Sequence, residues 1–333
     1  MRRSIRPAAL AAGVALVLSG CAAGSTVAGL RPPPAPVTSV APLAAPHARA
    51  IVSRAFTAAS QAESATGAQA DQARATAYTG PALTAARAQA RLDSVQPGLG
   101  GGSPALSPSQ PGLLAVSRGF GWPRVMVAQT VPAEGSLPVL HLLTSPNAVT
   151  PYRIAISASM LPNSTVRRFD PLTQGSRLVT DGTGLAVKPA TLLTTYAASL
   201  SYPSRRVADS AFTPDPFATQ IRQNAATQAS SVAAQSGFTQ QHEVVPGGTY
   251  AVEQAGGGAL VFALMRRTDT FTVKPGQTLT APKEFTALVP GQTRITSRAT
   301  MTTLELVVFG VPAAKGDATL LAASEQLVAA AGS

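Results

Sequence analysis

Apolar residues recur with two different periods along this chain, and the period changes from helical to strand-like twice. From His47 to about Gln69 the apolar positions share one helix face, which predicts an amphipathic helix. These positions are Ile51, Val52, Ala55, Phe56 and Ala59. Pro81 predicts the first turn of a second helix. Its apolar positions are Leu83, Ala86, Ala90 and Leu92. A segment rich in Gly and Pro at 96–112 then predicts a flexible loop.

Three short apolar or alternating runs follow the loop, each bounded by proline. The runs are 125–131, 137–143 and 152–161. Runs of this length between turn residues predict antiparallel strands. Phe120 and Trp122 stand two positions apart, so we expect them on one side of a hairpin, in the core.

The second half repeats this order of helices and strands. Helices are predicted at 190–200, after Pro189, and at 215–235, where Asp215 has the position of an N-cap and Pro216 that of the first helical residue. The predicted strands are 238–245, 249–254, 259–273 and 294–311. Asp317 is expected to cap a terminal helix with apolar positions at Leu320, Leu321, Leu327 and Val328.

Helices followed by antiparallel strands, in each half, are typical of the α+β class, because a doubly wound parallel sheet would alternate the two one by one. We therefore expect helices packed on curved antiparallel sheets. The order of elements predicts two tandem domains, a first α+β domain at 47–188 and a second at 189–333 with the C-terminal helix.

The second half, with helices at Ala190 to Leu200 and Asp215 to Gln235 and a long last strand from Arg294 to Val311, resembles the nuclear-transport-factor-2-like superfamily. The resemblance implies cone-shaped α+β halves in which helices and a bent sheet enclose an apolar pocket. Members of that superfamily use the pocket either as an enzyme site or for binding alone. The resemblance has no diagnostic motif and assigns no catalytic residue to this chain.

The N-terminal residues have the pattern of an export signal. Arg2, Arg3 and Arg6 precede a short apolar core from Ala8 to Leu18, which is too short to span a bilayer. Leu18, Ser19, Gly20 and Cys21 follow, and Cys21 is the only cysteine of the chain. Arg2 and Arg3 are compatible with either the general or the twin-arginine export route.

The string Leu18-Ser19-Gly20-Cys21 resembles the lipobox of bacterial lipoproteins. It implies a signal peptide at 1–20, attachment of diacylglycerol and palmitate-type acyl chains to Cys21, and a Pro/Ala-rich tether at 21–46. The alternatives are an ordinary secretory signal with a cysteine near its cleavage site, or a buried free thiol. The mature chain as a whole also resembles uncharacterised lipoproteins of actinobacteria. Both resemblances imply a cell-envelope protein on the extracytoplasmic face of the membrane.

The net charge of the chain indicates which classes of partner to expect. The chain of 333 residues has a net charge of +11, and removal of a signal peptide with three Arg leaves +8. This balance favours anionic neighbours. The expected partners are the membrane, through Cys21, and anionic envelope polymers or another envelope protein. Nucleic acid is not expected, because the Arg residues are scattered and are not interleaved with aromatic residues.

Candidate chemistry is sparse. His47, His141 and His242 stand alone in their segments, so we expect no metal site and no cofactor. His141 is interpreted as a hydrogen-bonded or exposed strand residue, and His242 with Glu243 as a polar strand edge. The glycine clusters at 182–184 and 256–258 fit hairpin turns. An acid–base pair remains possible among five dispersed acids, Asp170, Asp181, Asp209, Glu253 and Asp269.

Three functions remain open for a chain with these features. The first is a non-enzymatic binding or scaffold lipoprotein of the cell envelope. The second is a carrier of a lipid or another apolar ligand. The third is a cone-fold enzyme that uses dispersed acids. The sequence assigns Cys21 as the lipid attachment site and assigns no catalytic residue.

Overall fold

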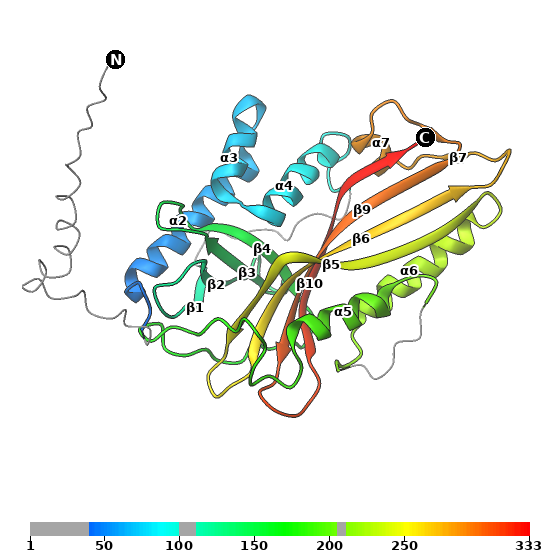
Figure 1. The fold of residues 1–333 in the computed structure, drawn as a ribbon. Coiled ribbons are helices and arrows are strands. Elements are labelled where there is room, and N and C mark those ends of the chain that lie inside the picture. Colours follow the sequence, from blue (N-terminus) through cyan, green and yellow to red (C-terminus); the bar gives the residue numbers. More distant parts are fainter. Residues whose placement is uncertain (1–39, 100–110, 205–210) are drawn as a thin grey trace, which may run out of the picture. The chain divides into compact units, whose positions relative to one another are not determined.

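The computed structural model describes residues 40–99, 111–204 and 211–333. Eight of the strands in these ranges form one antiparallel sheet, in the order β1-β2-β3-β4-β10-β9-β6-β5 (Figure 1). Four are short: β1 Gly112–Val116, β2 Arg124–Thr130, β3 Val139–Ser145 and β4 Arg153–Met160. Four are long: β5 Ser236–Glu253, β6 Ala259–Val273, β9 Arg298–Val311 and β10 Thr319–Gly332. A separate small hairpin joins β7 Leu279–Thr280 to β8 Arg294–Ile295.

Six α-helices in the described ranges pack around this sheet. Three precede the strands: α2 Ala45–Ser64, α3 Ala70–Ala77, reached through a short 3₁₀ turn at Gly67–Gln69, and α4 Gly80–Asp93. The others are α5 Pro189–Leu200, α6 Pro216–Val232 and α7 Lys283–Leu288. Proline occupies the first turn of α2, α4, α5 and α6, where its missing N–H leaves no hydrogen bond unmade. No helix in the described ranges has both the length and the apolar character of a membrane span.

The two parts of the sheet share one core. Val127 and Leu142 from the short strands pack in the same cluster as Phe262, Leu306 and Val308 from the long ones. One face of β1–β4 is therefore packed against one face of β6, β9 and β10, so the sheet is bent upon itself.

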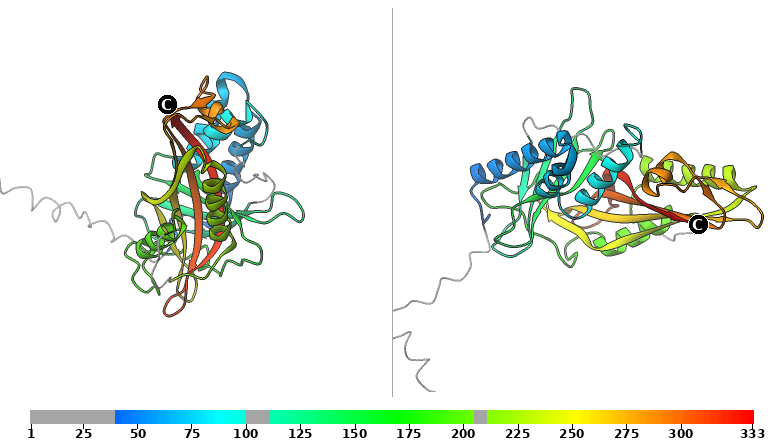
Figure 2. Two further views of the ribbon diagram at one scale, coloured as in Figure 1. Left: turned by 90° about the vertical axis from the view of Figure 1, so that its right-hand side faces the viewer. Right: turned by 90° about the horizontal axis from the view of Figure 1, so that it is seen from above.

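Helices cover the two outer faces. Phe56 of α2 packs with Met126, Ala128 and Leu143 on the outer face of the short strands. Leu193 and Tyr196 of α5 and Ile221 of α6 pack with apolar residues of β6 and β9. Figure 2 shows α2, α3 and α4 gathered over the short strands and α6 beside β5.

The backbone pairing that joins the two parts of the sheet is short. β4 pairs with β10 only at Met160 with Ala322 and at Ser159 with Ala323. The Ser159 amide also donates to Oγ of Ser324 (3.0 Å), and the Leu161 amide to the carbonyl of Leu321 (2.8 Å). α4 packs against β10, with Ala88 in the shared core and Leu92 against Leu327.

The α+β class and the packing of helices on antiparallel strands are confirmed, but no tandem domains are seen. Strands from both predicted domains, 47–188 and 189–333, belong to the one sheet and bury residues in the same core. The order of elements repeats, but two separate sheets would leave β4 and β10 as unpaired edges. These two strands pair with each other, so the two halves form one sheet.

The terminal helix predicted after Asp317 is wrong, because residues 319–332 form strand β10, which pairs with β9 along its length. Its apolar residues come in adjacent couples, Leu320 with Leu321 and Leu327 with Val328, and this spacing imitates a helix face. Both faces of β10 are buried there, and register shifts occur at both couples. Adjacent apolar residues can therefore both enter a core without a helix.

Most other elements match the sequence prediction. The helices at α2, α4, α5 and α6 and strand β6 are confirmed. Runs 238–245 and 249–254 are a single strand, β5, with a register shift at 245–248, where Pro246 and Gly247 interrupt the pairing. Gly256, Gly257 and Gly258 all have positive φ and form the turn from β5 to β6, as predicted. The predicted loop 96–112 lies largely outside the described residues.

The expectation that Phe120 and Trp122 belong to the core is wrong. They lie in the loop between β1 and β2, and 46% and 39% of their surfaces are exposed. The loop contains Gly119 and Gly121, which lets the chain turn outward instead of extending the strand.

Candidate functional site

A cavity of about 490 Å³ opens where the turn between β9 and β10, the start of α6 and the segment after β4 meet. Its charged and amide side chains are those of Asn163, Arg167, Asp215, Gln254 and Asp317. Threonine hydroxyls and apolar side chains, among them Leu320 and Leu321, complete the lining. This volume lies within the range of small-molecule sites, about 300–1,000 Å³.

Asp215 is the buried acid of this cavity, and only 7% of the residue is exposed. It caps α6 as predicted: its Oδ1 accepts a hydrogen bond from the amide of Ala218 (2.7 Å) and another from the hydroxyl of Tyr196 (3.2 Å). Oδ2 is buried and has no hydrogen-bond partner among the described residues. Burial raises the pKa of Asp215, and the two hydrogen bonds oppose this rise.

Tyr196 fixes the carboxylate in place. Its ring packs edge to face between Phe212 and Phe309, with centroid distances of 5.1 and 4.9 Å. The Tyr196 ring is fully buried, and burial raises the pKa of its hydroxyl, which remains a hydrogen-bond donor to Asp215. The carboxylate of Asp215 is thus held through Oδ1 by the first turn of α6 and by the hydroxyl of a packed aromatic ring.

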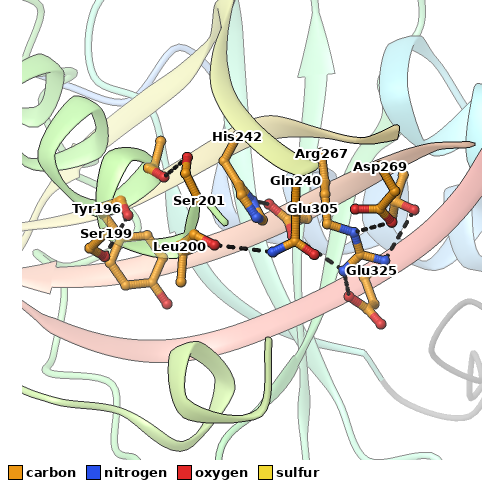
Figure 3. A network of polar contacts seen from close by, with 12 residues as sticks. Tyr196, Ser199, Leu200, Ser201, Gln240, His242, Arg267, Asp269, Glu305 and Glu325 are labelled. Carbon is orange, nitrogen blue, oxygen red and sulfur yellow. Dashed lines mark hydrogen bonds and ion pairs between the residues drawn. The ribbon is translucent and has the colours of Figure 1, made fainter. Parts of the chain in front are cut away.

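A second cluster of polar groups lies on the α5 side of the long strands (Figure 3). His242 of β5 is opposite Arg267 of β6, and Glu305 of β9 is opposite Glu325 of β10. Glu305 is also opposite Met265, two residues before Arg267, so all four side chains leave the same face of the sheet.

Hydrogen bonds and ion pairs join these groups into one network. His242 Nδ1 lies 2.8 Å from Oε2 of Glu305. The guanidinium of Arg267 contacts three carboxylates, with distances of 2.8 Å to Glu325, 3.2 Å to Asp269 and 3.7 Å to Glu305. One guanidinium therefore stands among three acids.

Burial dominates the electrostatics of the network. Burial raises the pKa of Asp269, and the nearby Arg267 lowers it by less. His242 Nε2, Asp269 Oδ1 and Glu305 Oε1 are buried without hydrogen-bond partners among the described residues. The side chain of Glu325 is the most exposed of the five, at 42%. The network is thus a mostly enclosed polar layer within an apolar face.

The histidines lie in different surroundings. His141 is hydrogen-bonded, one of the two possibilities expected: it is fully buried, and its ring nitrogens lie 2.9 Å from Thr130 Oγ1 and 2.8 Å from Ser157 Oγ. His242 and Glu243 lie on β5, an edge strand of the sheet, and Glu243 is exposed, but the side chain of His242 is fully buried against Glu305. His47 is exposed at the start of α2. No group of three or more potential metal ligands occurs within the described residues.

The four of the dispersed acids that the structure describes do not come together. Asp170 pairs with Arg118 (2.7 Å), Glu253 pairs with Arg177 (3.0 Å), and Asp181 accepts hydrogen bonds from Thr183. Asp209 lies outside the described residues, as does Cys21 with the predicted signal peptide. Asp269 alone joins the network.

Sequence reasoning missed Glu305 as the partner of His242 and Glu325 as a partner of Arg267. A signal for Glu305 was present, since a carboxylate between Leu304 and Leu306 in a long predicted strand has to be either exposed or paired. The pairing itself depends on strand order, which the pattern does not reveal. Comparison of the chain with protein-family models, curated proteins and solved structures finds no match.

Proposed function

We propose that this protein is a lipid-anchored binding module of the cell envelope and that the cavity beside Asp215 is its ligand site. The anchor is Cys21, and the module lies on the extracytoplasmic face of the membrane. Its ligand is a small molecule, and anionic envelope polymers or another envelope protein are further partners of the same surface.

The observation that carries this proposal is a cavity of about 490 Å³ whose lining includes the buried acid Asp215 together with Arg167 and Gln254. Carboxylate and amide oxygens in the lining can accept hydrogen bonds from a ligand N–H or O–H group. The apolar lining from Leu320 and Leu321 suits a ligand with an apolar portion. An amine or alcohol attached to an apolar group therefore fits this cavity best.

The other two functions have less support. A wholly apolar ligand would offer no hydrogen bond to the polar side chains of the cavity, Asp215, Arg167 and Gln254. An enzyme would use the network of His242 and Glu305, which has the residue types of an acid–base pair. That network is enclosed, and Glu325 offers its main exposed group. The cone-like arrangement of the second half remains part of the proposal, since two helices, α5 and α6, are followed by four long strands.

Native mass spectrometry of the protein extracted from membranes tests the ligand site. We expect a bound small molecule on the wild-type chain, released by organic solvent. Leu321→Trp fills the cavity and should abolish this extra mass, whereas Asp215→Asn should weaken its retention while preserving the helix cap. Val149→Trp, at an exposed turn, is the matched control and should keep the ligand. If the extra mass persists in Leu321→Trp, the cavity is not the binding site.

Replacement of Cys21 tests the anchor separately. Cys21→Ala should leave the membrane fraction, because two acyl chains provide the anchor in this proposal. A Cys21→Ala chain that stays membrane-bound after a high-salt wash would contradict it.

A further inference from the structure

Exposed aromatic side chains lie at one end of the short strands. The loop between β1 and β2 carries Phe120 and Trp122, and the loop between β3 and β4 carries Val149, of which 91% is exposed. The two loops are neighbours, because Arg124 at the start of β2 pairs with Ser145 at the end of β3. We call these two loops, residues 117–123 and 146–152, the aromatic end.

The charged groups at this end are basic. The guanidinium of Arg124 lies over the ring of Trp122, 4.1 Å from its centroid, and over Phe120 at 5.9 Å. Arg153 begins β4 at the same end, with β3 between it and Arg124 and its side chain on the other face of the sheet. Segments 117–124 and 145–153 contain no Asp or Glu, and Asp170, the acid that reaches this end, is paired with Arg118. The aromatic end therefore combines exposed aromatic rings with uncompensated positive charge.

The described chain also begins here. The amide of Gly119 donates to the carbonyl of Val40 (3.0 Å), and the side chain of Val40 is exposed. Val40, the first residue that the structure describes, therefore lies at the aromatic end.

We propose that the aromatic end docks on the anionic surface of the membrane that holds the anchor. This inference rests on the proposed lipid anchor at Cys21. Trp and Phe rings insert at the level of lipid headgroups, where one side of the ring is apolar and the other wet. Arg side chains near the surface add attraction to anionic lipids. Docking through this end fixes the orientation of the folded body relative to the membrane, which a tether alone does not fix.

Trp122 is the only tryptophan of the chain, so its fluorescence reports on this contact directly. The lipidated protein is reconstituted into phosphatidylcholine vesicles that contain phosphatidylglycerol and brominated acyl chains. We expect the emission of Trp122 to shift to the blue and to be quenched by the brominated chains. Arg124→Gln should weaken the docked state about fivefold, and salt of about 1 M should do the same by shortening the Debye length to about 3 Å.

Two matched variants control for charge and for nonspecific quenching. Arg294→Gln removes the same charge from an exposed residue of β8 and should leave the quenching unchanged. Leu137→Trp in a Trp122→Phe background moves the reporter to the exposed loop at the opposite end of β2 and β3, where quenching should be absent.

Flotation of the vesicles separates the two proposals. Protein that floats with the vesicles while Trp122 stays unquenched overturns docking and leaves the anchor intact. Equal quenching from Trp122 and from Leu137→Trp also overturns it. Protein that neither floats nor shows quenching overturns both the anchor and the docking.

Discussion

Nδ1 of His242 lies 2.8 Å from Oε2 of Glu305, although strand β6 separates the strands that carry these two residues. Each side chain reaches diagonally across β6, beside Arg267. Both side chains are fully buried, so each meets a large desolvation cost if the other is removed.

Loss of the Glu305 carboxylate should therefore destabilise the fold. We expect Glu305→Ala to lower the free energy of unfolding by about 3 kcal/mol, measured by urea denaturation. Glu243→Ala is the matched control, since Glu243 adjoins His242 but pairs with Arg266 in solvent. This control should change stability by less than about 1 kcal/mol. Equal effects of the two substitutions would mean that the network contributes nothing beyond an exposed ion pair.

His141 should make stability depend on pH below neutrality. Burial lowers the pKa of His141 from 6.5 to about 3, so the unfolded chain binds the proton first as the pH falls. The stability due to the neutral imidazole is complete above pH 6.5 and is lost as the pH drops toward 3. Between pH 7.5 and 5 this loss amounts to about 2 kcal/mol.

Denaturation curves at several pH values measure this effect. The loss of stability between pH 7.5 and 5 should be smaller by about 2 kcal/mol in His141→Gln. It should be unchanged in His47→Gln, because His47 is exposed. An unchanged slope in His141→Gln would show that His141 is not the group responsible.

Two substitutions of Asp215 should separate its role as the N-cap of α6 from the effect of its charge on stability. Asp215→Ala removes the cap of α6 and should cost about 1 kcal/mol, whereas Asp215→Asn keeps an acceptor for the Ala218 amide. Because burial raises the pKa of Asp215 in the folded state, its carboxyl favours folding at low pH, and this contribution disappears as the pH rises through the raised pKa. Wild type should therefore gain stability relative to Asp215→Asn as the pH falls from 7 to 4. If wild type instead loses stability relative to Asp215→Asn as the pH falls, burial does not raise the pKa of Asp215.

The junction between β4 and β10 should depend on Ser324. Ser324→Ala leaves the amide of Ser159 without its acceptor and should lower the free energy of unfolding by about 1–3 kcal/mol. Ser230→Ala, which removes a hydroxyl from the exposed face of α6, should lie within about 0.5 kcal/mol of wild type. If the two serines behave alike in thermal unfolding, the hydrogen bond at the junction has no net effect.

Local signals account for the elements that the sequence predicted well. Asp215 and Pro216 place the start of α6, and the turn glycines at 256–258 place the start of β6. Such signals depend on neighbouring residues alone, which is why they can be recognised in a single sequence.

The parts that were missed depend on contacts distant in the sequence. Leu320 and Leu321 are adjacent and face different clusters, and only the presence of packing on both sides of β10 distinguishes this strand from a helix. Likewise, the pairing of His242 with Glu305 follows from strand order. Of the residues around the cavity, the sequence predicted only the role of Asp215 as the N-cap of α6. The other walls come from the segment after β4 and from β9 and β10, which are distant in the sequence.

The pairing of β4 with β10 also dictates the order in which the chain can be completed. Ser159 and Ser324, which meet at this junction, are 165 positions apart. When the N-terminal half emerges from a ribosome or an export channel, β4 has no neighbour on its outer edge until the last strand has emerged. An open strand edge attracts other chains. The nascent protein therefore has to be shielded until its final residues arrive, and a chain truncated before residue 319 would keep that edge exposed permanently.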